Sequence, residues 1–172
     1  MELKGKSVAI LAADLYNEYE LIYPYYRLLE AGARVLVVGA GDAKSYKSKV
    51  GLPVSVDAAV GDISADDFDG VVIPGGFAPD FMRRTPAMVE FVRQMHLGGK
   101  VVAAICHAGW MLASAEILQG RTVTSFFAIK PDMVHAGANW IDEECVVDGK
   151  LITARTPADL PAFMRAVVAA LK

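Results

Sequence analysis

The sequence has few cysteines and no long apolar run. Only two cysteines, Cys106 and Cys145, occur among 172 residues, and they form no CxxC pair, so neither a disulfide framework nor a zinc site is indicated. The apolar runs are broken by residues such as His107, Glu116 and Arg165, and they fall well short of the roughly 20 residues that a membrane helix needs. These absences favour a soluble protein in a reducing cytoplasm, with no metal site and no cofactor.

The sequence also lacks any block of like charge. Lys and Arg number 17, Asp and Glu number 20, and the formal net charge is −3. The cluster of Lys44, Lys47 and Lys49 is flanked by Asp42 and Asp57. This mixture has no footprint for nucleic acid or for a membrane surface, so a small neutral or mildly polar substrate is the more plausible partner.

The composition indicates one compact domain covering residues 1–172. Hydrophobic residues make up 54% of the chain, which is too apolar for disorder, and 15 Gly and 8 Pro interrupt it too often for a coiled coil. The apolar stretch near the start ends at Asp14 after only a few residues and no cleavage pattern follows, so we read it as a first strand rather than a signal peptide.

Short β-branched runs alternate with longer amphipathic segments along the chain. The runs predicted as strands are 7–13, 34–40, 70–76, 101–106 and 121–125, and the segments predicted as helices are 20–32, 86–99, 108–118 and 159–171. This alternation predicts a three-layer α/β/α sandwich with a mainly parallel sheet. Segments 45–57 and 144–154, the latter with an Asp148-Gly149 turn, are expected as small antiparallel additions at the sheet edges.

The segment VVAAICHAGW carries the strongest chemical signal. An apolar strand ends at Cys106 and is followed directly by a helix, and the small residues Ala104 and Ala108 stand two positions before and after the cysteine. This is the pattern of a nucleophile elbow. The helix amino end is expected to lower the thiol pKa and to supply oxyanion donors. His107 follows at once, but consecutive side chains at such a turn diverge, so only a structure can show whether they meet. The alternative is a buried cysteine that ends a core strand.

Acidic side chains follow the first predicted strand. Ligands of open α/β sheets bind beyond the carboxyl ends of the strands, so this loop and the Cys106 turn are expected to face one cleft. Glu20 would be partly desolvated there, and its protonated carboxyl could donate a hydrogen bond to the thiolate. The alternative is that Glu18 and Glu20 only complement the helix dipole.

A Pro-Gly-Gly sequence follows the strand at 70–76. Gly75 and Gly76 allow close backbone approach, and their amides could bind an oxyanion, although such a sequence is often only a turn. His96, His135 and Cys145 repeat no ligand spacing, and we expect them to be structural or exposed.

Several segments together carry a family resemblance. They are ELIYPYYRLLEAG, VVIPGGFAPD, AICHAGW, GRTVTS, AGANWIDEECVVDGKLITAR and TPADLPAFM. In this order and spacing they resemble the PfpI/ThiJ family, closest to its intracellular-protease-like branch, within the class I glutamine amidotransferase-like superfamily. The resemblance implies a flavodoxin-like fold, a homodimer or higher homo-oligomer, and peptidase, cofactor-independent glyoxalase, deglycase, chaperone or oxidative-stress roles.

The resemblance also implies roles for particular residues. Cys106 matches the family's reactive cysteine, His107 the adjacent histidine, and Glu20 the glutamate that hydrogen-bonds the cysteine. Asp80 matches an acid that pairs with the histidine of a neighbouring subunit. Its sequence position after Ile73-Pro74 suggests that it projects outward at the rim of the site.

Three positions depart from the family pattern. Asn17 stands where many relatives have a second glutamate, Phe77 where the close branch often has arginine, and Phe126 where it often has tyrosine. Phe126 is expected to line the substrate site with Gly75 and Gly76. Asn17 and Phe77 lack the charge, and Phe126 the hydroxyl, that these relatives carry. The substrate that the chain recognises can therefore differ from that of the close branch.

The leading hypothesis is a cofactor-independent cysteine enzyme that acts on reactive carbonyls or on their early protein and nucleotide adducts. Cys106 would attack the carbonyl carbon, the backbone N–H groups of Gly76 and His107 would bind the oxyanion, and Glu20 and His107 would move protons. One alternative is an intracellular cysteine peptidase. Another is a non-enzymatic redox-responsive stress or chaperone protein, in which Glu20 stabilises a Cys106 sulfinate.

Overall fold

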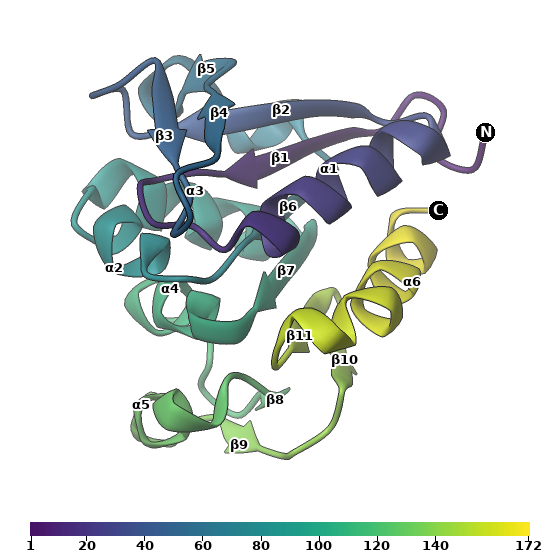
Figure 1. Cartoon of the computed structure of the whole chain (residues 1–172). Helices are drawn as coiled ribbons and strands as arrows, with labels where there is room; N and C mark the ends of the chain where they lie inside the picture. Colours follow the sequence, from purple (N-terminus) through teal and green to yellow (C-terminus); the bar gives the residue numbers. More distant parts are fainter.

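The computed structural model describes residues 1–172 and contains a seven-stranded, mainly parallel sheet. Its strands are β1 (Ser7–Leu11), β2 (Arg34–Gly39), β5 (Ala58–Ala59), β6 (Gly70–Ile73), β7 (Val101–Ile105), β10 (Cys145–Asp148) and β11 (Leu151–Ala154). They lie in the order β10-β11-β7-β6-β1-β2-β5 (Figure 1). Only the β10–β11 pair is antiparallel.

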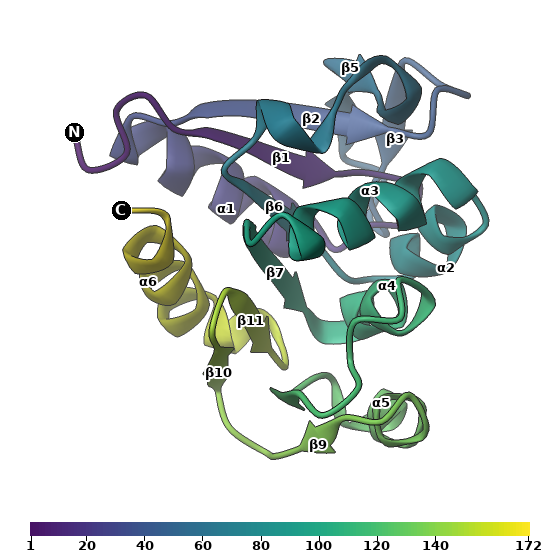
Figure 2. The same cartoon turned by 180° about the vertical axis from the view of Figure 1, so that it is seen from behind.

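Helices cover both faces of this sheet. They are α1 (Glu18–Ala31), α2 (Ala78–Arg83), α3 (Pro86–Leu97), α4 (Gly109–Ser114), α5 (Lys130–His135) and α6 (Leu160–Leu171). Helices α1 and α6 pack together on one face, and α3, with α2 and α4 beside it, covers the other (Figures 1 and 2). The predicted three-layer α/β/α sandwich is confirmed.

The order of the strands fixes where a site can form. The chain passes from β1 through α1 to β2 in one direction along the sheet, and from β6 through α3 to β7 in the other. The carboxyl ends of β1 and β6 therefore lie at the point where the strand order reverses, which is where open α/β sheets bind ligands. The loops that follow β1, β6 and β7 meet there.

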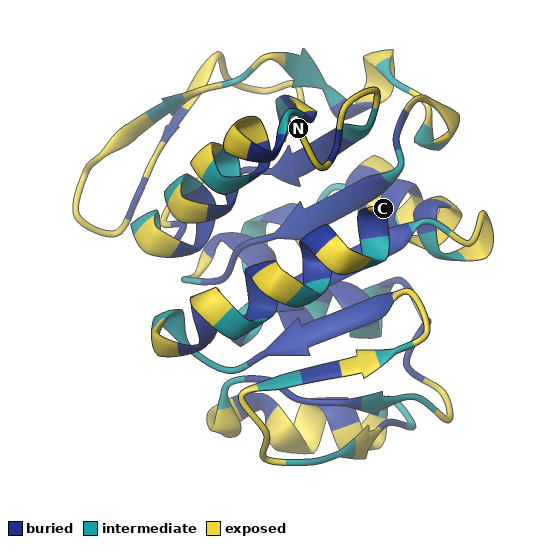
Figure 3. Cartoon of the chain, turned by 90° about the vertical axis from the view of Figure 1, so that its right-hand side faces the viewer, coloured by how far each residue is buried: buried dark blue, intermediate teal, exposed yellow.

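The central strands form the core between the helix layers. All residues of β6, β7 and β11 are buried, and the helices expose only their outer faces (Figure 3). Helix α1 ends because Gly32 adopts a left-handed conformation, with φ 92°, and donates its N–H to the carbonyls of Leu28 and Leu29. The end predicted for this helix is confirmed.

The two expected antiparallel additions differ from the prediction in part. Strands β3 (Ser45–Lys47) and β4 (Pro53–Ser55) do form an antiparallel pair, but as a separate two-stranded sheet. Strand β11 belongs to the main sheet, because it pairs in parallel with β7. Only β10 is an antiparallel edge strand. Both strands of the hairpin look alike in sequence, and only the pairing with β7 distinguishes them.

The prediction that residues 121–125 form a strand of the main sheet is wrong. Only β8 (Thr122–Val123) forms, and it pairs with β9 (Asn139–Trp140) in a two-stranded sheet. Side chains take the backbone donors of this segment. The Thr122 N–H donates to Asp148 Oδ2 at 2.8 Å, and the Thr124 N–H donates to Thr153 Oγ1 at 2.9 Å.

Three short helices were not described correctly from the sequence. The predicted helix at 108–118 ends at Ser114, and Glu116 has a φ of 58° that a helix cannot continue. Helices α2 and α5 span six residues each, too few for the apolar periodicity to register. No helix of the structure has both the length and the apolar character needed to cross a membrane.

Candidate active site

Cys106 lies at a strained turn between β7 and α4. Its φ is 63°, a left-handed conformation that non-glycine residues rarely adopt, and a short 3₁₀ turn over Cys106–Ala108 follows it. Ala104 and Ala108 are both buried, so the turn has small neighbours, as expected. This geometry is that of a nucleophile elbow. Cys106 itself is 8% exposed, so its thiol lies just below the surface.

Glu20 reaches Cys106 from the start of α1. Its side chain is fully buried, and Oε2 accepts a hydrogen bond from the Gly75 N–H at 2.8 Å. A Cβ built on Gly75 would lie 2.6 Å from Glu20 Oε2 and 2.8 Å from Cys106 Cβ. The carboxyl and the cysteine therefore meet across a glycine that has no room for a side chain. The loop after the first strand and the Cys106 turn therefore lie together, as expected from their places at the carboxyl ends of the strands, whereas a shared cleft stays a prediction.

The other oxygen of this carboxyl is unusual. Glu20 Oε1 is buried and has no partner with hydrogen-bond geometry. The Cys106 thiol interacts with this carboxyl and lowers the pKa of Glu20. A buried acceptor without a partner costs free energy, roughly 1–3 kcal/mol for a neutral group and more for a charged one. Protonation of the carboxyl would relieve this cost.

Gly76 holds the loop after β6 close to the loop after β1. The Phe77 N–H donates to Leu15 O at 2.9 Å, and the Asn17 N–H donates to Gly75 O at 3.2 Å. Gly76 has a φ of 75°, and a Cβ there would lie 2.4 Å from Leu15 O. The backbone N–H groups of His107 and Gly76 face the Cys106 thiol closely enough to lower its pKa. These are the two donors that the sequence suggested for an oxyanion.

The electrostatics of the pair differ from the sequence-based expectation. Burial raises the pKa of Glu20 to about 7, as expected in direction. Burial, followed by the charge of Glu20, raises the pKa of the Cys106 thiol to about 12, so the predicted acidic thiol is wrong for this arrangement. The N–H groups of His107 and Gly76 act in the opposite direction and lower it. Burial also raises the pKa of Cys145 to about 11, so the two thiols are not separated in the expected way.

The cause of this difference is the coupling between the two acids. With Glu20 ionised, a second negative charge on the adjacent sulfur is disfavoured. A single proton shared by the pair can reside on the sulfur or on the carboxyl, and the net charge is the same in both arrangements. Within the pair, a thiolate forms without a second negative charge when this proton moves to Glu20.

His107 does meet the sulfur, although it is the next residue in the chain. Its Nδ1 lies 3.3 Å from Cys106 Sγ. The imidazole stacks on Phe126 at a centroid distance of 4.8 Å and contacts Trp110 edge-on at 5.1 Å. Burial, and then the charge of Lys49, lower the pKa of His107, which favours the neutral imidazole that can accept a proton.

Asp80 lies apart from this cluster within the chain. It is in the first turn of α2, and its carboxylate pairs with the guanidinium of Arg84 one turn later. The Asp80 side chain is about one quarter exposed. It makes no hydrogen bond to the chain's own His107.

The three departures from the family pattern have defined places. Asn17 caps α1, where its Oδ1 accepts a hydrogen bond from the Tyr19 N–H at 3.1 Å. Phe77 is 43% exposed and contacts Trp110 edge-on. Phe126 packs on the imidazole of His107, and its backbone N–H donates to Cys106 O at 3.2 Å.

Two neighbours of the site were missed in the sequence. Trp110 lies one helical turn after His107, a spacing that brings side chains together and could have been noticed. Lys49 belongs to the β3–β4 hairpin, and its N–H donates to Tyr16 O at 3.0 Å. Its charge lowers the pKa of both Glu20 and His107. No local pattern indicated that this hairpin lies beside the site.

The sheet is mainly parallel, and Cys106 stands at a left-handed elbow where it faces a buried glutamate and an adjacent histidine. These features define a class of α/β proteins that hold a potential nucleophile above the sheet. The DJ-1/PfpI family model matches residues 6–170, and the chain belongs to this family. The resemblance noted in the sequence is confirmed.

Relatives at similar length carry different names. The chain is 45% identical over 170 residues to a deglycase of Pyrococcus abyssi, covering 96% of this chain and 99% of that protein. It is 38% identical over 170 residues to general stress protein 18 of Bacillus subtilis, covering 98% and 99%.

Solved structures share the fold closely. A two-domain protein of Anabaena variabilis, with DJ-1/ThiJ/PfpI-like and ferritin-like domains, superposes with a TM-score of 0.94 at 44% identity. The match covers 96% of this chain and 48% of that protein, so the chain spans about half of its length.

Proposed function

We propose that this chain is a cofactor-independent cysteine hydrolase of the deglycase and glyoxalase type, with Cys106 as the nucleophile. The observation that carries the proposal is the left-handed Cys106, whose sulfur meets the Glu20 carboxyl, the His107 imidazole and two backbone N–H groups. The deglycase of Pyrococcus abyssi, at 45% identity, supports the reaction class. Substrates would be small dicarbonyls and their early adducts with protein or nucleotide amines.

The first step would be formation of the thiolate and its attack. The thiol proton moves to Glu20, whose pKa of about 7 lets it both accept and return a proton near neutral pH. The sulfur then attacks the carbon that carries the adduct's hydroxyl and amine, the amine leaves with a proton, and a hemithioacetal remains on Cys106. Lactate formation from free methylglyoxal begins with the same hemithioacetal.

The second step would convert the hemithioacetal into a thioester. One proton leaves the carbon bonded to sulfur and another is delivered to the neighbouring carbonyl carbon, so the first carbon is oxidised as the second is reduced. The N–H groups of Gly76 and His107 would stabilise the oxyanion of this step, and their lowering of the Cys106 pKa supports this role. Water, deprotonated by His107, then hydrolyses the thioester to a hydroxy acid and free Cys106.

The proposal extends to the assembly. Asp80 would bind His107 of another subunit, and its position in a short, partly exposed helix supports this role. The site would then be complete only in a homo-oligomer. We further propose that the chain forms one domain and acts in the cytoplasm on small carbonyl compounds, with Phe126 and Gly75 bordering the substrate.

Incubation with methylglyoxal tests the proposal. We expect the wild-type protein to produce lactate and to release amine from freshly glycated N-acetyl-lysine, and we expect Cys106→Ser to do neither. Cys145→Ser is the matched control, because it removes the other thiol and should keep full activity. Stoichiometric conversion of Cys106 to sulfinate by peroxide, without any turnover, would instead favour the redox-responsive stress protein. Cleavage of unmodified peptides without lactate production would favour the peptidase.

A further inference from the structure

His107 has no carboxylate partner within its own chain. The only polar contact of its imidazole is the one between Nδ1 and Cys106 Sγ at 3.3 Å. The one acid expected to pair with it, Asp80 of another subunit, pairs with Arg84 within the chain. A proton-transferring imidazole must be held in one orientation, a task that a hydrogen-bonded third group often performs. Within the subunit, another kind of contact must therefore fix the ring.

Aromatic rings enclose the imidazole on two sides. Phe126 stacks on it at 4.8 Å, with an angle of 28° between the ring planes. Trp110 contacts it at 5.1 Å with an angle of 65°, so the two neighbours meet it in different directions. Rotation of the ring about its side-chain bonds would break one of these contacts. The pair therefore restricts the direction in which Nδ1 points.

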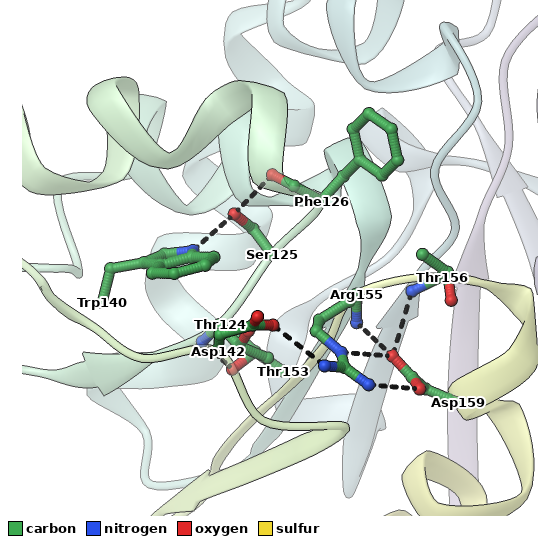
Figure 4. Close-up of polar contacts among 9 residues, drawn as sticks. All are labelled: Thr124, Ser125, Phe126, Trp140, Asp142, Thr153, Arg155, Thr156 and Asp159. Atoms are coloured by element: carbon green, nitrogen blue, oxygen red, sulfur yellow. Dashed lines mark hydrogen bonds and ion pairs between the residues drawn. The ribbon is translucent and has the colours of Figure 1, made fainter.

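The Phe126 side of this arrangement is anchored by polar contacts (Figure 4). The indole N–H of Trp140 donates to Ser125 Oγ at 3.0 Å, and that hydroxyl donates to Phe126 O at 3.0 Å. The Thr124 N–H donates to Thr153 Oγ1 on β11, the strand beside β7. Ser125 is 1% exposed, so its side chain is shielded from water, and the three bonds hold the segment before Phe126.

The Trp110 side is anchored as well. Its indole N–H donates to Asp132 Oδ2 at 3.3 Å, which ties α4 to α5. Phe77 packs edge-on against the same indole at 6.4 Å, and the Arg83 guanidinium lies over it at 5.8 Å. Each aromatic neighbour of His107 is thus held by contacts that do not involve His107.

We propose that Phe126 and Trp110 are positioning residues that clamp the His107 imidazole so that Nδ1 stays in reach of the Cys106 sulfur. This inference rests on the proposed function for its catalytic consequence, and it gives Phe126 a role in addition to the proposed one of bordering the substrate. The clamp acts within one subunit, so it operates independently of any contact from Asp80 of another.

Substitution of Phe126 separates positioning from mere packing. We expect Phe126→Ala to lower kcat for methylglyoxal by about 10- to 100-fold, the size of effect that a misplaced catalytic group produces, with KM changed less than threefold. Phe126→Tyr keeps the ring and should restore kcat to within about threefold of the wild type. Phe127→Leu is the matched control: this side chain is 71% exposed and touches Phe126 but not His107, so kcat should stay within about twofold.

A second readout needs no turnover. With three histidines in the chain, the imidazole of His107 can be followed by NMR titration. Burial lowers its pKa, so Phe126→Ala should raise that pKa toward the ordinary value, whereas Phe126→Tyr should not. Both variants keep the charged and titratable groups near the imidazole, which are Lys49, the Cys106 thiol and Glu20. A change in the His107 pKa therefore reports on the contact between its imidazole and the ring of residue 126.

The two readouts distinguish failure of the clamp from failure of the proposed function. An unchanged kcat and an unchanged His107 pKa in Phe126→Ala would overturn the clamp. A raised pKa with a wild-type kcat would also overturn it as a positioning device. If the wild type has no turnover at all, the proposed function fails, and the clamp is then decided by whether the imidazole signal of Phe126→Ala shows exchange between orientations that the wild type and Phe126→Tyr lack.

Discussion

At the scale of single residues, the proposed chemistry depends on one proton shared by Glu20 and Cys106. Burial raises both pKa values, and the charge of Glu20 adds to the increase at the thiol. The carboxyl thus has two opposing effects: it disfavours the thiolate while it is ionised, and it makes the thiolate accessible by taking up the proton. Replacing a group with this double role should therefore separate the acidity of the thiol from the rate of turnover, two properties that usually change together.

Substitution of Glu20 with Gln tests that separation. The amide keeps an acceptor for the Gly75 N–H but carries no charge, so the Cys106 pKa should fall. Alkylation by iodoacetamide at pH 8 should then become faster than in the wild type, by about tenfold for each unit by which the pKa falls while the thiol remains mostly protonated. Turnover of methylglyoxal should drop by at least about 10²-fold, because the carboxyl proposed to accept and return the thiol proton is gone.

Cys145 serves as the internal reference in the same labelling reaction. Its pKa depends on its own burial and on Glu144 and Asp159, none of which Glu20→Gln changes. Slower alkylation of Cys106 in the variant would show that ionised Glu20 does not oppose the thiolate, contrary to the coupling described above.

At the scale of elements, the site depends on two loops that approach one another at Gly76. The loop after β1 and the loop after β6 share backbone hydrogen bonds on either side of Tyr16, which also bridges to Ser48 in the hairpin. A side chain at Gly76 would meet the backbone of the opposing loop rather than a flexible side chain. The positions of Glu20 and of the oxyanion donors therefore depend on this one approach.

A pair of glycine substitutions measures what the approach requires. Gly76→Ala and Gly99→Ala both place a side chain at positive φ, 75° and 67°, but only the first meets neighbouring atoms, whereas Gly99 has open space around it. We expect Gly99→Ala to cost about 1–2 kcal/mol of unfolding free energy with normal activity, which is the backbone cost alone. Gly76→Ala should cost at least about 3 kcal/mol and abolish turnover.

Urea unfolding with an activity assay checks both variants. Equal losses of stability would mean that the loop gives way to the added methyl group, and that the close contact at Leu15 O does not constrain the site.

At the scale of the whole molecule, the proposed site extends beyond one chain. Mixing inactive Cys106→Ser subunits with inactive Asp80→Ala subunits should restore activity, because some interfaces then pair an intact Cys106 and His107 with an intact Asp80. Random exchange between two-fold related subunits gives about a quarter of the wild-type rate. Native mass spectrometry confirms that exchange has occurred. Exchange without recovery, or full activity of Asp80→Ala alone, would restrict the site to Cys106, Glu20 and His107 of one subunit.

The sequence by itself determined the layers of the fold and indicated the main residues of the candidate site. Continuous apolar strands alternating with amphipathic helices predict a parallel sandwich, because both faces of such a sheet must be buried. Strand β7 followed by Cys106 and a helix predicts the elbow, and the family pattern pointed to Glu20. The strand, helix and elbow signals are local, carried by residues close together in the chain, whereas the family pattern extends along nearly all of it.

Only the tertiary structure decided the properties that depend on contacts between distant segments. The segment around Thr122 left the main sheet because Asp148 and Thr153 bind its backbone donors. Burial and the charge of Glu20 reversed the expected direction of the thiol pKa. Phe126, 19 residues beyond His107 by their sequence numbers, came to stack on its imidazole. Desolvation and side-chain stacking are set by which segments the fold brings together, so no local pattern could have predicted them.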